Sequence, residues 1–169
     1  MARGLGHDRA LVVVRGRHCE AGDAAHALAS AARTKVLFDV SDAASPEVAA
    51  QRVAASGPDV DGFTTNVGGY APERVAIATS RAISRAFAAI AGKRDYTAVI
   101  DSSRNGKPVS GAGNPAGARI GSYEVLSDDG APQQLWLTVP GISDGPCGTA
   151  PSSRAGDFVP DLAAALARR

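Results

Sequence analysis

Short apolar runs recur along the first hundred residues of this 169-residue chain, separated by stretches that carry helix signals. The runs are residues 11–14, 36–38, 62–65 and 97–100. They are too short for helices and suit strands that are buried on both faces. Strands that alternate with helices at short spacing predict a parallel sheet with right-handed crossovers. We therefore expect an α/β fold with a mainly parallel sheet.

Three stretches between or beside these runs predict helices, over residues 23–33, 45–56 and 72–92. Asp23 can cap the first of them. The second has the clearest start, because Ser45-Pro46-Glu47 supplies a capping hydroxyl, a proline at the first helical position and an acid in the first turn. We expect the third helix to be the longest.

The third predicted helix should bury an apolar face formed by Ile83, Phe87 and Ile90. Three arginines lie largely away from this face, at positions 74, 81 and 85. They are typical of a solvated surface, and the alternative is a strip that binds phosphate.

The pattern after residue 106 is less regular. Residues 107–121 contain four glycines and two prolines, which predicts a long loop, either a binding loop or lid or a disordered segment. Residues 135–139 predict the last strand, residues 140–156 a second irregular segment, and residues 158–169 a closing helix.

Composition excludes several classes of protein. A formal net charge of +1 gives no electrostatic attraction to nucleic acid or to an anionic membrane. No apolar run approaches the roughly 20 residues of a membrane-spanning helix, and residues 11–14 are too few for the core of a signal peptide. No cluster of cysteine and histidine has zinc spacing, so we expect neither a metal nor a cofactor.

Polar residues follow the predicted strands. Asp39, Asn66, Asp101 and Asp144 each come after one, and the ends of parallel strands meet at one edge of a sheet. Carboxylates and amides beside Trp136 suit a sugar, because they bond hydroxyl groups while an indole stacks on the ring. The alternative is that these residues only cap turns, with an ion pair between Asp101 and an arginine holding the loop.

Four segments carry a family resemblance. Residues 101–106 read Asp-Ser-Ser-Arg-Asn-Gly and residues 136–145 read Trp-Leu-Thr-Val-Pro-Gly-Ile-Ser-Asp-Gly. Upstream of them, residues 36–39 read Val-Leu-Phe-Asp and residues 62–70 read Gly-Phe-Thr-Thr-Asn-Val-Gly-Gly-Tyr. In this order, they resemble the signature segments of glycoside hydrolase family 6, the inverting cellulases that include endoglucanases and cellobiohydrolases. The resemblance covers the chain from about Val36 to its end.

The resemblance implies a distorted β/α barrel and a β-1,4-glucan or related oligosaccharide as ligand. It implies an inverting reaction, with Asp144 as the base that activates water and Asp39 as a supporting residue. The positions that match the family's sugar-binding motifs are Asn66, Tyr70, Asp101, Arg104, Asn105, Asn114 and Trp136.

The chain departs from the family at the general acid. The family carries this acid in a Glu-Pro-Asp segment after an earlier strand, whereas residues 15–17 here read Arg-Gly-Arg. A guanidinium does not release its proton near neutral pH and cannot serve as that acid. Ala112, Thr138 and Ile142 replace three further family residues that contact sugar.

We therefore expect residues 10–169 to form one truncated domain of this family, preceded by a flexible segment over residues 1–9. It would be a β-1,4-glucan hydrolase by descent, without its acid. The alternative is a non-catalytic carbohydrate-binding or scaffold domain. About five strands are too few to close a barrel, so we expect a homo-oligomer through the edge at residues 11–14, or a cover from the N-terminal segment.

The resemblance also bears on the two cysteines. In the family, the cysteine at the position of Cys147 pairs with one in a Trp-Cys-Asn-Pro segment, and that segment here reads Ala112-Gly113-Asn114-Pro115. Cys147 is then a free thiol, or it pairs with Cys19. The family is usually extracellular, and this chain shows no signal peptide.

Overall fold

The computed structural model describes residues 10–14, 34–55, 60–92, 96–111, 113–125 and 131–168. These residues group into two compact units. Among the described residues, unit 1 holds 10–14, 34–55, 60–65, 77–92, 96–100 and 131–133. Unit 2 holds residues 66–76, 101–111, 113–125 and 134–168.

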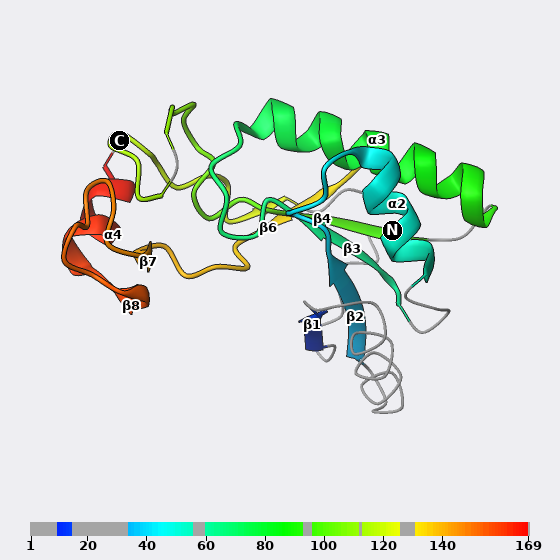
Figure 1. Cartoon of the computed structure of the whole chain (residues 1–169), viewed down its shortest axis with the longest axis horizontal. Helices are drawn as coiled ribbons and strands as arrows, with labels where there is room; N and C mark the ends of the chain where they lie inside the picture. Colours follow the sequence, from blue (N-terminus) through cyan, green and yellow to red (C-terminus); the bar gives the residue numbers. More distant parts are fainter. Residues whose placement is uncertain are drawn as a thin grey trace. The chain divides into compact units, whose positions relative to one another are not determined.

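Unit 1 is built on parallel strands that hydrogen-bond to one another in sequence order, which confirms the predicted sheet. Figure 1 shows them with the two helices that follow β2 and β3. The elements are β1 (Ala10–Val14), β2 (Thr34–Asp39), α2 (Pro46–Ala55), β3 (Gly62–Thr65), α3 (Glu73–Ala91) and β4 (Thr97–Asp101). The predicted helix over residues 23–33 lies outside the described residues.

The helix start predicted at Ser45 is confirmed. Its hydroxyl accepts a hydrogen bond from the Val48 backbone N–H at 3.3 Å, and α2 begins at Pro46. Buried residues of this helix, among them Val53, pack in the unit 1 core with Phe38 and Phe63 of the sheet. The capping hydrogen bond and the buried apolar residues therefore both support a helix that begins at Pro46.

Helix α3 adds Ile83 and Phe87 to the same core, and Phe87 stacks on Tyr96 with ring centroids 4.1 Å apart. The prediction for Ile90 is wrong, because its side chain is 51% exposed. Ala91, four residues after Phe87, packs against the core instead, so the last turn directs this residue inward. The three arginines of the helix are exposed, as expected for a solvated face.

Unit 2 is richer in loops and short antiparallel pairs. Strand β5 (Glu124–Val125) pairs with β6 (Gln133–Leu135), and β7 (Ile142–Asp144) pairs with β8 (Ala155–Phe158). A small apolar cluster joins Leu162 and Leu166 of α4 (Pro160–Leu166) to Ala118. The closing helix was predicted from residue 158 but begins at Pro160, since residue 158 still belongs to β8.

Two strand predictions in unit 2 are wrong. The strand predicted over residues 135–139 ends at Leu135, because the Leu137 N–H and the Thr138 hydroxyl donate to the Asp101 carboxylate instead of a neighbouring strand. The segment predicted as irregular over residues 140–156 contains β7 and the start of β8. Every residue of β8 is exposed, so it carries no apolar alternation that would predict a strand.

None of the helices that the structure describes combines the length and the apolar composition needed to cross a membrane.

Candidate functional site

Asp101, at the end of β4, is a buried and heavily bonded carboxylate. Its side chain is 1% exposed, and its two oxygens accept four hydrogen bonds at 2.6–3.2 Å. The donors are the backbone N–H groups of Gly68, Ser103 and Leu137 and the hydroxyl of Thr138. A carboxylate has about four acceptor sites, so these donors use its capacity and tie three segments of unit 2 together.

Asn66 lies directly after β3 in a left-handed conformation, with φ of 60°. Its side-chain N–H donates to the Asp101 carbonyl at 2.8 Å, and its side-chain oxygen accepts from the Ala71 N–H at 3.1 Å. Gly68 also has a positive φ, and a Cβ there would lie 2.9 Å from a guanidinium nitrogen of Arg104. The chain therefore turns tightly here and delivers Tyr70 to the site.

Arg104 is buried, with a side chain 2% exposed. Its Nη2 lies 2.9 Å from an Asp144 oxygen, and its Nη1 donates to the Ile142 carbonyl at 3.1 Å. The guanidinium carbon lies 4.3 Å from the centre of the Tyr70 ring, which is within the range of a cation–π contact. Arg104 thus pairs with Asp144, not with Asp101 as in the alternative considered from the sequence.

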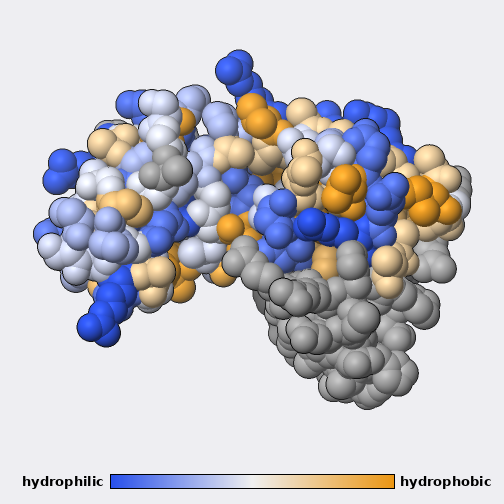
Figure 2. Space-filling model, viewed as in Figure 1, coloured by the Kyte–Doolittle hydropathy of each residue, from blue (hydrophilic) through white to orange (hydrophobic). Residues whose placement is uncertain are grey.

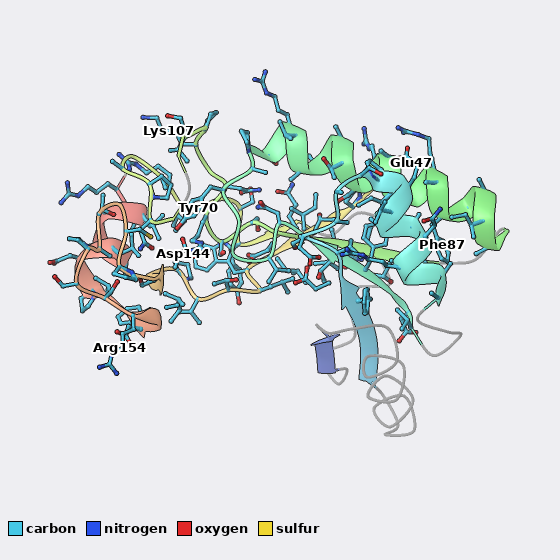
Figure 3. The ribbon with its side chains drawn as sticks, in the orientation of Figure 1. Glu47, Tyr70, Phe87, Lys107, Asp144 and Arg154 are labelled. Atoms are coloured by element: carbon cyan, nitrogen blue, oxygen red, sulfur yellow. The ribbon has the colours of Figure 1, made fainter. Side chains whose placement is uncertain are left out.

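Asp144, the predicted base, ends β7. Besides Arg104, its carboxylate accepts from the Tyr70 hydroxyl at 2.8 Å and from the Asn114 backbone N–H at 3.0 Å. Figure 3 shows Tyr70 and Asp144 close together, with Lys107 and Arg154 away from this pair. The Asp144 side chain is 29% exposed, so one acceptor site of its oxygens is left for a water or a sugar hydroxyl.

Asn114 is fully buried and fixes the backbone around Asp144. Its side-chain NH₂ donates to the Ser143 hydroxyl and to the carbonyls of Gly145 and Cys147, at 2.9–3.2 Å. Its side-chain oxygen accepts from the Asp144 N–H at 3.0 Å. Both its NH₂ group and its oxygen bond protein groups next to Asp144, so Asn114 holds the candidate base in place.

Trp136 and Asn105 differ in how protein groups hold them. The Trp136 indole N–H donates to the Gly121 carbonyl at 3.2 Å, and its ring meets Tyr123 edge to face. Asn105 is 2% exposed, and its NH₂ has no hydrogen-bond partner among the described residues. Its side-chain oxygen lies so close to Gly121 that a Cβ there would overlap it.

Asp39, the predicted supporting residue, belongs to unit 1, whereas the other eight predicted site residues belong to unit 2. It ends β2 and is 6% exposed. One of its oxygens accepts from both the N–H and the hydroxyl of Ser41, at 3.0 and 2.6 Å. Its supporting role stays a prediction.

Tyr70 is held as a hydrogen-bond donor. Burial raises the pKa of its phenol well above the ordinary range, the Arg104 cation opposes this rise, and the hydrogen bond to Asp144 adds to it. The phenol therefore keeps its proton and shares it with the Asp144 carboxylate at any physiological pH.

Thr138 and Ser143 bond other residues of the site and were not predicted from the sequence. Thr138 was noted there only because it replaces a lysine of the family, but its hydroxyl donates to the Asp101 carboxylate at 2.6 Å. Ser143 is 3% exposed, accepts from the Gly145 N–H at 3.0 Å and bonds the Ser153 hydroxyl at 2.6 Å. A hydroxyl beside a strand-end aspartate is a frequent pattern, so it gives no distinctive signal in a sequence.

Cys147 is a free thiol, bonded through its sulfur to Asn114 and to the Gly145 carbonyl at 3.6 and 3.5 Å. Cys19 lies outside the described residues, and so do residues 15–17, where the resemblance expects the acid. Within the described part of the chain, no three histidine, cysteine or acidic residues gather as metal ligands would.

Comparison with known proteins gives one consistent family. A profile described as "Glycosyl hydrolases family 6" matches residues 22–169. Endoglucanase 1 of Streptomyces halstedii is 40% identical over 105 residues, which are 60% of this chain and 32% of that protein. Endoglucanase A of Cellulomonas fimi is 34% identical over 110 residues, 63% of this chain and 23% of that protein. The chain thus spans about a third or less of these relatives.

Solved structures agree. The endoglucanase Cel6 from Mycobacterium tuberculosis, in complex with methyl-cellobiosyl-4-deoxy-4-thio-β-D-cellobioside, matches with a TM-score of 0.77 and 27% identity. The match covers 96% of this chain and 62% of that one. The GH6 enzyme of Orpinomyces sp. Y102 shares the fold at a TM-score of 0.73 and 21% identity, over 86% of this chain and 53% of that one. These likenesses confirm the expected fold class, and the profile match over residues 22–169 shows that this chain belongs to glycosyl hydrolase family 6.

Proposed function

We propose that unit 2 binds a β-1,4-linked glucan and that Asp144 is the general base of an inverting hydrolysis. In such a reaction one carboxylate takes a proton from water while a second carboxyl group protonates the leaving oxygen. We assign no residue to the role of the acid that protonates the leaving oxygen. The family resemblance expects this acid near residues 15–17, which read Arg-Gly-Arg here. The chain would then bind glucan and cleave it slowly at best.

The environment of the Asp144 carboxylate is the observation that carries the proposal. Three donors orient it, one of them the guanidinium of Arg104, and 29% of its side chain stays open. A base needs a fixed orientation and access to water, and this carboxylate has both. The partly exposed carboxylate contrasts with Asp101, which is 1% exposed and fully bonded.

The relatives support glucan as the ligand. Two of them are named endoglucanases, and a solved relative at 27% identity carries a thio-linked cellobioside ligand. The aromatic and hydroxyl-bonding groups of unit 2 are of the kind that bind sugars, because aromatic rings stack on pyranose faces and polar groups bond their hydroxyls.

A second candidate is a non-catalytic carbohydrate-binding or scaffold domain. The same three hydrogen bonds favour it, since they take most of the acceptor capacity of Asp144. Sugar binding without any release of product would support this candidate.

The experiment compares reducing-sugar release from soluble β-1,4-glucan, and calorimetric binding of cellohexaose, between the wild-type chain and Asp144→Asn. The matched control is Asp157→Asn, an exposed aspartate of β8 whose side chain caps the Arg154 N–H. We expect wild type and control to bind cellohexaose, and any slow release to disappear in Asp144→Asn. Fast cleavage that survives Asp144→Asn would contradict the role of Asp144, and no binding at all would contradict the site.

A further inference from the structure

Among the described residues, Tyr123 is the most exposed large hydrophobic residue, at 68%. It lies in unit 2 directly before β5, and it is not among the site residues that the family motifs predict. The others in this group are Val75, Ile90, Val139 and Phe158, at 45–60%. Where unit 2 shows in Figure 2, most of its surface is hydrophilic or neutral.

The Tyr123 ring is exposed on one side and contacts a second aromatic ring on another. Its centroid lies 5.1 Å from that of Trp136, and the two ring planes stand at 88°. The indole is fixed in turn, because its N–H donates to the Gly121 carbonyl at 3.2 Å. The hydroxyl of Ser102 donates to the Ser122 carbonyl at 2.5 Å, so the backbone directly before Tyr123 is also held.

This edge-to-face arrangement leaves an open ring face on Tyr123. If its edge points at the indole, both of its faces stand clear of Trp136, and if its face receives the indole edge, the opposite face stays clear. The exposure of 68% shows that other side chains do not cover it. Trp136 is more buried than Tyr123, so the better platform is the tyrosine.

A fixed, open aromatic face next to groups that bond hydroxyls is suited to a pyranose ring. The C–H face of a β-linked glucosyl unit is flat and apolar, because its hydroxyls are equatorial, and the phenol oxygen can bond one of them at the rim. We propose that Tyr123 stacks on a glucosyl unit of the bound glucan and that Trp136 is the positioning residue that sets the angle of its ring. The inference rests on the proposed function and adds to it a sugar contact outside the family motifs.

The test is calorimetric titration of cellohexaose into the full chain and its variants. Tyr123→Ala should weaken binding about five- to tenfold, the range of an aromatic contact, whereas Tyr123→Phe keeps the face and should stay within about twofold of wild type. Phe158→Ala is the matched control, because it removes another exposed aromatic ring of unit 2 and should leave affinity unchanged. Tyr123→Leu keeps apolar bulk without a flat face and replaces the alanine variant if that one unfolds.

Trp136 is the one tryptophan of the chain and supplies a second readout. Its emission should change as cellohexaose binds, and this change should be smaller in Tyr123→Ala at equal ligand concentration. Equal affinity of wild type, Tyr123→Ala and Tyr123→Leu would overturn the inference and leave the proposed function standing. A wild-type chain that binds no cellohexaose would overturn both.

Discussion

At the scale of the residue, the buried guanidinium of Arg104 is the group on which the candidate site depends. It bonds the Asp144 carboxylate and the Ile142 carbonyl and lies over the Tyr70 ring. Arg104→Met should destabilise the fold by about 2–3 kcal/mol, less than a fully buried pair would cost, because water can reach the abandoned carboxylate. Urea unfolding followed by circular dichroism measures this change.

Arg52→Met is the control for that variant. Arg52 bonds Asp42 at 2.9 Å, but the Asp42 side chain is 83% exposed. An ion pair so open to water contributes about 0–1 kcal/mol, so this variant should unfold nearly like wild type. Equal losses of unfolding free energy in the two variants would contradict the structural role given to the buried Arg104 guanidinium.

Tyr70 gives the site a pH dependence of stability. Its folded-state pKa is raised above the ordinary value of 10.0, so the folded chain holds this proton more tightly than the unfolded chain. The resulting stability is complete below that ordinary value and is lost as pH rises through the folded-state pKa.

The unfolding free energy of wild type should therefore fall between about pH 9 and pH 11, and Tyr70→Phe should remove part of this fall. Urea unfolding of the two proteins at several pH values gives the comparison. Parallel pH profiles of unfolding free energy for wild type and Tyr70→Phe would contradict the raised pKa of the buried Tyr70 phenol.

At the scale of the element, the pairing of β3 with β4 depends on Gly62. In the parallel register Gly62 lies opposite Thr97, and a Cβ on this glycine would overlap the Thr97 carbonyl oxygen. Backbone cannot move aside as a flexible side chain can, so Gly62→Ala should cost about 3 kcal/mol or more, or prevent folding. Thermal and urea unfolding measure the loss.

Gly92→Ala serves as the comparison. Gly92 has a φ of 72° and nothing lies within 4 Å of the position of a Cβ, so only backbone strain opposes the substitution. The cost should be about 1 kcal/mol. A larger loss at Gly92 than at Gly62 would contradict the packing argument for β3.

The elements that could be predicted from the sequence are those with a physical signal in the chain itself. Helix α2 has its cap at Ser45, and strands β1 to β4 are apolar runs. Strands β5, β7 and β8 are two to four residues long, and their hydrogen bonds depend on partners that only the fold provides. The same holds for the end of β6, where the Asp101 carboxylate replaces a neighbouring strand.

For the site, the order of strand ends along the chain predicted a set of residues, and all of these strand-end residues except Asp39 lie in unit 2. The hydrogen bonds that hold Asn66, Asp101 and Asn114 were not predicted, because they run to groups of unit 2 that only the fold brings close. Partner choice follows from rotamers and backbone angles, such as the φ of 36° at Asn114. A sequence carries no direct record of such angles.

At the scale of the whole molecule, the sheet begins with β1, which has β2 as its neighbour. A sheet edge invites pairing with another chain unless a segment covers it. We predict a homo-oligomer that forms through β1. Analytical ultracentrifugation should show a mass above that of the 17.1 kDa chain at micromolar concentration. A single monomeric species with the β1 edge open to solvent would contradict this prediction.

The central proposal is that Asp144 is a working base and that the chain lacks the family's general acid, since residues 15–17 read Arg-Gly-Arg. The most direct test is the hydrolysis of β-cellobiosyl fluoride, because fluoride leaves without protonation and the reaction then needs only the base. We predict fluoride release with inversion by wild type, loss of about a hundredfold or more in Asp144→Asn, and little cleavage of cellohexaose by either. Equal fluoride release by wild type and Asp144→Asn would contradict the claim.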